Sequence, residues 1–123
     1  MSETYLPPIV EVARVQSRLK KGSAELLILS LLEDDRLHGY EIGKRIATRS
    51  GGRLSFHASS LYPVLFRMEK RGWIKGTWVE REGERRRRFY SLTKKGRHAL
   101  AVQRESWREF TVAVNLVVEP SHA

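Results

Sequence analysis

The feature that most constrains this chain is a single stretch of strand-like sequence set among segments of helical pattern. Trp73–Glu80 has the alternating pattern of a strand and contains β-favouring side chains. Glu82-Gly83-Glu84 supplies a turn, and Arg87–Leu92 has the composition of a returning strand. The pattern predicts one two-stranded hairpin. The other periodic segments, on both sides of the hairpin, are then expected to be helices.

Apolar residues at helical spacing predict helices before and after the hairpin. A short helix is expected within Ile9–Lys20, and the segment 24–33 is apolar on nearly every side, as in a helix at the centre of a core. Further helices are expected at Gly39–Ser50 and from Ser60 to about Arg71. The last and longest helix should start after Thr93, with apolar residues close to a 3.5-residue repeat.

Capping residues set the expected start of two helices, the one from Ser60 to about Arg71 and the long C-terminal one. Ser59 and Ser60 are good N-caps, and Pro63 would then fall in the first helical turn, where a missing N–H is tolerated. Thr93 can cap the long helix, which Pro120 would end after about 26 residues, a length of about 39 Å.

This order of elements predicts a mainly α fold with a small β-hairpin, namely a winged helix-turn-helix plus a long C-terminal helix. The helix-turn-helix comprises Gly39–Ser50 and Ser60–Arg71, and the hairpin is the wing. At the start of the first of these helices, we expect Gly39 to allow a close approach and Tyr40 to dock into the core. His38 beside them is expected to be structural.

The charge of the chain is concentrated in its middle. The net charge is +9, yet residues 36–98 hold 17 Lys and Arg against 5 Asp and Glu, whereas the remaining residues are slightly acidic. Such segregation is typical of a surface that meets a polyanion. Double-stranded DNA or another nucleic acid is therefore the expected partner, ahead of an anionic membrane surface.

Other classes of protein are disfavoured by what the sequence lacks. The absence of cysteine excludes disulfides and thiolate metal sites. The four histidines show no metal-ligand spacing, and no P-loop, GxGxxG or GxSxG is present, so no metal, cofactor, catalytic residue or enzyme activity is predicted. No apolar stretch is long enough to span a bilayer and no secretion signal is visible, so we expect a cytoplasmic protein without a membrane partner.

A recognition helix presents its first two turns to base edges and phosphates in the major groove. The core stripe of the predicted recognition helix is Leu61, Leu65 and Met68, and its candidate DNA contacts are Ser59, Ser60, Tyr62, Pro63 and Arg67. Hydroxyl groups suit phosphates, and Arg67 suits guanine or a phosphate. Phe66 is also off the stripe, and two readings stay open for it: contact with a thymine methyl group, or packing beneath the wing.

Four consecutive arginines, Arg85, Arg86, Arg87 and Arg88, follow the turn of the hairpin. Because strand side chains alternate, the four cannot share one face. We expect Arg85 and Arg86 in a groove or on phosphates, since arginine is favoured in a narrow minor groove. Arg87 and Arg88 are expected to be divided between phosphates and packing.

The strings GSAELLILSLL, HGYEIGKRI, SSLYPVLFRMEKRGWI and ERRRRFYSLTKKG resemble the PadR-like winged-helix transcriptional regulators. The similarity runs from about Lys21 to Val118, and the combined order HGY, LYP, RRxxY and LTxxG makes it specific. With its single C-terminal helix, the chain is similar to the short form of that family. Three residues differ from those usual in the family: Ser59, Phe66 and Glu84.

The resemblance implies a homodimer, held by the C-terminal helices, that binds a palindromic operator and represses transcription. It divides the chain into an N-terminal extension (1–20), a DNA-binding domain (21–92) and a dimerisation helix with its tail (93–123). It also implies effectors that are planar aromatic molecules. The expected interface and effector residues are Leu100, Trp107, Phe110 and Val114.

Two alternatives stay open. One is a non-specific architectural protein that binds nucleic acid with the same basic face. The other is a small-molecule-binding dimer built around Trp107, for which DNA is secondary.

Overall fold

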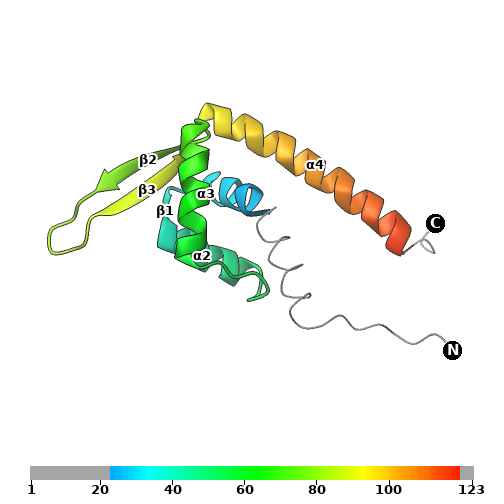
Figure 1. The fold of residues 1–123 in the computed structure, drawn as a ribbon, viewed down its shortest axis with the longest axis horizontal. Coiled ribbons are helices and arrows are strands. Elements are labelled where there is room, and N and C mark those ends of the chain that lie inside the picture. Colours follow the sequence, from blue (N-terminus) through cyan, green and yellow to red (C-terminus); the bar gives the residue numbers. More distant parts are fainter. Residues whose placement is uncertain (1–22, 120–123) are drawn as a thin grey trace.

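The computed structural model describes residues 23–119 (Figure 1). Residues 23–32 are helical, and the elements that follow are β1 (Leu37–His38), α2 (Gly39–Arg49), α3 (Ala58–Lys70), β2 (Ile74–Val79), β3 (Arg87–Leu92) and α4 (Lys94–Val118). This is the predicted winged helix-turn-helix with a long C-terminal helix. The short helix expected within Ile9–Lys20 lies outside the described residues. No helix in the described part is long and apolar enough to cross a membrane.

The hydrophobic core forms where the helix of residues 23–32 meets α2, α3 and the sheet. That first helix alone buries Ala24, Ile28, Leu29, Leu31 and Leu32, which confirms its predicted central position. The predicted stripe of α3, formed by Leu61, Leu65 and Met68, is fully buried. The core therefore holds the outer side of α3 in a defined orientation toward solvent.

The sheet has three antiparallel strands in the order β1-β3-β2, one more than predicted. β1 was missed because it is only two residues long, and such a segment carries no detectable alternation. In the hairpin, Trp78 pairs with Arg88 and Val79 pairs with Arg87. Because successive side chains of a strand point to opposite faces, Arg87 and Arg88 lie on opposite faces of the wing, as expected.

The start of α3 differs from the prediction. The helix begins at Ala58, with His57 as its N-cap, because the amides of Ser60 and Leu61 already donate to the His57 carbonyl. The expected capping role of Ser59 and Ser60 was wrong, and both hydroxyls lie exposed within the first turn. Pro63 lies inside the helix rather than in its first turn.

The first part of the long helix α4 packs against the domain, and its remainder projects away from it (Figure 1). Thr93 is its cap, as predicted, and accepts a hydrogen bond from the Gly96 amide at 3.0 Å. Arg104 donates two hydrogen bonds to the Glu33 carboxylate, at 3.0 and 2.8 Å, which fixes the direction of α4 relative to the first helix. Hydrogen bonding to Arg104 lowers the pKa of Glu33.

The position of Leu100 corrects the expected interface. Leu100 is only 2% exposed and belongs to the hydrophobic core of the domain, so its side chain is not available to an interface. The reason is that α4 is still in contact with the domain at this point. The apolar residues of α4 that lie exposed follow Leu100: Val102, Trp107, Phe110, Val112, Val114, Leu116, Val117 and Val118.

Candidate nucleic-acid interface

The outer side of α3 brings the predicted contact residues together. With its core stripe buried, the helix leaves exposed all five of them, namely Ser59, Ser60, Tyr62, Pro63 and Arg67. This follows from the period of 3.6 residues, which places them on the side opposite the core. Tyr62 also packs against α2, because a Cβ at Gly39 would lie 2.9 Å from its Cε1. That contact confirms the close approach expected at Gly39.

Phe66 lies on the same exposed side, with the Lys70 ammonium 5.1 Å from the centre of its ring. Its side chain is 61% exposed, so packing beneath the wing, one of the two readings left open, is not what the structure shows. The exposed ring is therefore left among the candidate contacts of α3.

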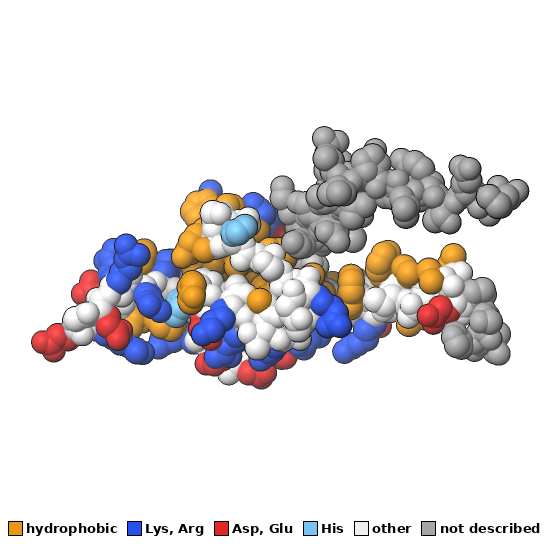
Figure 2. Space-filling view, turned by 90° about the horizontal axis from the view of Figure 1, so that it is seen from below, with side chains coloured by type: hydrophobic (Ala, Val, Ile, Leu, Met, Phe, Trp, Pro, Cys, Tyr) orange, Lys and Arg blue, Asp and Glu red, His pale blue; other side chains and the backbone are white. Residues whose placement is uncertain are grey.

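The wing carries a run of four arginines beside the glutamates of its turn. Figure 2 shows Lys and Arg side chains on the wing and along the adjoining edge of the domain, with acidic residues at the tip of the wing. Arg85, Arg86 and Arg87 are exposed. The guanidinium of Arg86 lies 4.3 Å from the ring centre of Trp78, and 3.9 Å separates its Nη1 from Oε1 of Glu80. Trp78 was not predicted to be part of this surface.

Arg88 does not belong to the exposed set. Its guanidinium donates two hydrogen bonds to the Glu69 carboxylate of α3, at 3.1 and 2.8 Å. Arg88 was named as a DNA contact from the sequence, but its Nε and Nη2 both bond a carboxylate of the same chain. Of the two roles foreseen for Arg87 and Arg88, packing describes Arg88.

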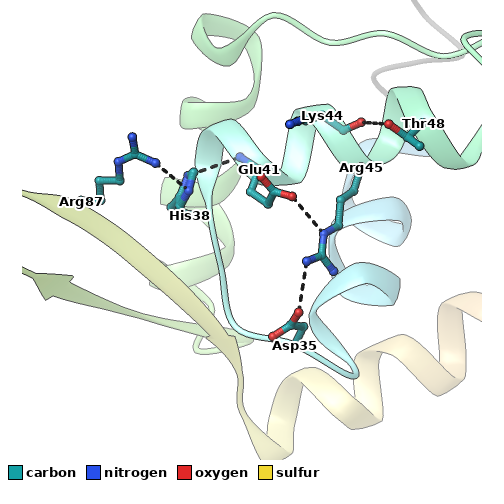
Figure 3. A network of polar contacts seen from close by, with 7 residues as sticks. All are labelled: Asp35, His38, Glu41, Lys44, Arg45, Thr48 and Arg87. Carbon is teal, nitrogen blue, oxygen red and sulfur yellow. Dashed lines mark hydrogen bonds and ion pairs between the residues drawn. The ribbon is translucent and has the colours of Figure 1, made fainter. Parts of the chain in front are cut away.

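Arg87 joins a chain of polar contacts at the start of α2 (Figure 3). Its Nη1 lies 2.9 Å from Nε2 of His38, and Nδ1 of the same ring lies 3.3 Å from the Glu41 amide nitrogen. Because a neutral imidazole accepts at one nitrogen only, the ring accepts either from Arg87 or, in the other tautomer, from the Glu41 amide. The Glu41 carboxylate in turn accepts from Arg45, which also pairs with Asp35 at 3.2 Å. His38 is therefore the N-cap of α2, which agrees with the structural role expected for it.

Burial, and after it the positive charge of Arg87, lowers the pKa of His38. A protonated ring accepts at neither nitrogen, so protonation removes the cap of α2. Because the folded-state pKa is depressed, the unfolded chain takes up the proton first as the pH falls. The contribution of His38 to stability is thus complete above about pH 6.5 and is lost as the pH falls through its folded-state pKa.

We expect the His38→Asn variant, which keeps a capping side chain but cannot titrate, to lose part of this pH dependence. Urea unfolding of both proteins between pH 7.5 and pH 5 measures the effect. The wild type should lose more of its free energy of unfolding than the variant over this range, because only the wild type takes up a proton at position 38 when it unfolds. A matched His98→Asn variant, altered at an exposed position of α4, should follow the wild type. Parallel curves for His38→Asn and wild type would contradict the capping argument.

Tyr40 and Lys44 of α2 lie beside these elements, and neither was named from the sequence as a candidate contact. Tyr40 was expected in the core, but it is 67% exposed, because Ile42 and Ile46 turn the other side of α2 inward. The two-residue offset from Ile42, which places Tyr40 on the far side of the helix, was the available signal. Tyr40 and Lys44 line a pocket of about 330 Å³ between α2 and the start of α3, with Gly39, Gly43, Phe56, His57, Ala58 and Leu61.

No group of His, Asp and Glu side chains in residues 23–119 is arranged to hold a metal ion.

Comparisons with known proteins identify the family. The model of the transcriptional regulator PadR-like family matches residues 28–102. A transcriptional regulator from Clostridium thermocellum is 31% identical, with a TM-score of 0.77 over 84% of this chain and 97% of that one. A PadR family transcriptional regulator from Eggerthella lenta is 26% identical, with a TM-score of 0.76 over 88% of this chain and 92% of that one.

The fold is also similar to Bacillus subtilis PadR, whose crystal structure is a complex with operator DNA. That protein is 26% identical, with a TM-score of 0.59 over 64% of this chain, which spans 44% of the PadR chain. The matched family is one of regulators, not of enzymes. Together with the winged helix-turn-helix and its exposed basic surface, these similarities show that the chain belongs to the PadR-like family of transcriptional regulators.

Proposed function

We propose that this protein is a cytoplasmic, homodimeric repressor that binds a palindromic DNA operator through α3 and the wing. The observation that carries the proposal is the meeting of these two elements at the start of α2. Tyr62 of α3 packs on Gly39, and Arg87 of the wing contacts His38 one residue earlier. The exposed edge of α3 and the arginines of the wing therefore flank one surface. The operator complex of Bacillus subtilis PadR supports DNA as its ligand.

The second copy of the chain is proposed to pack along the exposed part of α4. Beyond Leu100 this helix presents Trp107, Phe110 and Val114 within about one third of its circumference. Figure 2 shows hydrophobic side chains in a row on this helix. An apolar row on a helix that projects from its own domain suits a self-complementary interface about a two-fold axis. Two recognition helices related in this way match half-sites separated by one turn of DNA, about 34 Å.

Mobility-shift titration against the promoter region of its own gene and against unrelated duplexes tests the function. Arg85→Ala combined with Arg86→Ala should lower affinity for every duplex by about 10- to 100-fold and reduce the salt slope by roughly 1.8, because two phosphate contacts are lost. Arg67→Ala should change the preference between sequences more than the salt slope. The same charge removed from α4 by Arg97→Ala and Arg108→Ala should have little effect. Equal affinity for all duplexes would favour the non-specific architectural alternative.

The same dimer would provide a site for a planar aromatic effector that releases the operator. Trp107 is half-exposed, and its ring lies 6.0 Å from that of Phe110 at an angle of 37°. Two copies facing each other across a two-fold axis could hold a flat ring between their tryptophans. Fluorescence quenching by a panel of flat aromatic compounds, present in the wild type and absent in Trp107→Phe, is the expected result. Quenching that leaves DNA affinity unchanged would favour the alternative in which DNA is secondary.

A further inference from the structure

Arg88 and Glu69 connect the wing to the recognition helix in a fixed geometry. The two hydrogen bonds run from Nε to Oε1 and from Nη2 to Oε2, so the planar fork of the guanidinium meets both carboxylate oxygens. A two-point contact of this kind defines an orientation as well as a distance. The side chains are 29% and 25% exposed, which limits the competition from water. Hydrogen bonding to Glu69 raises the pKa of Arg88.

The neighbouring strand β2 leaves space for the Arg88 side chain at Gly76. A Cβ built on Gly76 would overlap the Nε, Cζ and Nη2 atoms of Arg88. The ring of Trp78, which is paired with Arg88 in the sheet, has its centre 5.4 Å from the Cζ atom. Glycine weakens the interior of a strand. Its presence at position 76 is explained by the space that Arg88 needs to reach Glu69.

This contact is the only ion pair between α3 and the wing among residues 23–119. β2 and β3 are paired from Ile74–Leu92 to Val79–Arg87, so a contact made by either strand also constrains the other. The buried end of the hairpin, at Ile74 and Tyr90, is anchored in the core. Arg88 lies farther out along β3 than Tyr90, where a link to α3 has more leverage over the angle of the wing.

We propose that Glu69 and Arg88 are positioning residues that set the angle between the wing and α3, so that both can engage one DNA duplex at once. This inference rests on the proposed DNA-binding function and deepens it. A wing already held at the binding angle loses less conformational freedom when the complex forms. Arg88 thus acts on DNA through Arg85 and Arg86 rather than by touching it.

The link can be broken from either end. Glu69→Met removes the acceptor, and Gly76→Ala displaces the guanidinium without changing any charge. Each variant should lower operator affinity by about 10-fold. When Arg85→Ala and Arg86→Ala are added to either variant, the further loss of affinity should be several-fold smaller than the loss that they cause in the wild type. Such non-additivity reports coupling between the link and the wing arginines.

Glu25→Met is the matched control. It removes the 2.7 Å ion pair between Glu25 and Arg71, the C-cap residue of α3, which connects this end of α3 to the helix of residues 23–32 and not to the wing. This variant should keep both the operator affinity and the full cost of the wing substitutions. If Glu25→Met behaves like the two link variants, the link has only a general structural role and the proposal is overturned.

A measurement without DNA separates this inference from the proposed function. Backbone order parameters of the wing amides 80–86, from NMR relaxation of the full chain, should fall in Glu69→Met and Gly76→Ala but not in Glu25→Met. A rigid amide gives about 0.85 and a flexible one less than 0.6. Unchanged order parameters in both link variants would contradict the positioning role of Glu69 and Arg88, even if the protein binds DNA. A fall in them for a protein that binds no DNA would leave the link in place and overturn only the proposed function.

Discussion

Replacement of Phe110 by aspartate is expected to convert the proposed dimer into monomers and to lower affinity for a full palindromic operator by about 10²- to 10⁴-fold. The side chain is 59% exposed in the single subunit, so the fold of each subunit should survive the change. At a two-fold interface the substitution is present in both copies, so it places two carboxylates in an apolar contact. Charges there are costly unless they are paired. A monomer then binds each half-site separately and loses the effective concentration that the dimer provides.

Sedimentation velocity and mobility-shift titration of the variant measure these two effects. Val112→Asp is the matched control, because Val112 is also 59% exposed and lies roughly 200° around α4 from Phe110. It introduces the same charge on the side of the helix away from Trp107 and should leave both the dimer and the affinity unchanged. Dissociation by Val112→Asp alone would place the interface on the other side of α4. A Phe110→Asp protein that remains a dimer with full affinity would refute the proposed arrangement.

Gly96→Ala is expected to destabilise the fold by about 2 to 4 kcal/mol, even though alanine is the better helix former by about 1 kcal/mol. Gly96 lies in the first turn of α4, and a Cβ there would overlap the backbone carbonyl of Trp73 as well as the side chain of Leu92. A carbonyl cannot move aside as a side chain can. The Thr93 hydroxyl lies 2.6 and 2.9 Å from the Gly72 and Trp73 carbonyl oxygens, which share its one proton, and it accepts a hydrogen bond from the Gly96 amide. These contacts hold the two segments together.

Thermal unfolding at constant protein concentration should show the melting temperature of Gly96→Ala lowered by about 10 °C or more. Gly43→Ala is the control, since Gly43 is also helical but its Cβ would meet the flexible end of Leu61 at 3.3 Å. There the gain in helix propensity should largely offset the crowding, and the change should stay within about 1 kcal/mol. Equal melting temperatures for both variants would show that the helix end can shift away from Trp73.

The prediction of the fold succeeded where the pattern along the chain was long or rich in turn residues. β3 was predicted with its observed bounds, and Thr93 caps α4 as expected. The error at the start of α3 arose because two serines are good caps in isolation, whereas backbone bonds to the His57 carbonyl start the helix earlier. A chain-local rule cannot weigh such competition, since the outcome depends on how the preceding segment packs.

The same distinction separates what the sequence by itself determined from what only the tertiary structure decided. The sequence determined the order of the elements, the exposed edge of α3 and the alternation of the wing arginines, because helical and strand periods decide which side chains share a face. The sequence could not decide which of these side chains stay exposed and which pack or pair with another element. Arg88 faces Glu69, 19 residues away, and Leu100 meets the core before α4 leaves the domain. These outcomes depend on contacts between elements distant in sequence, which no local period encodes.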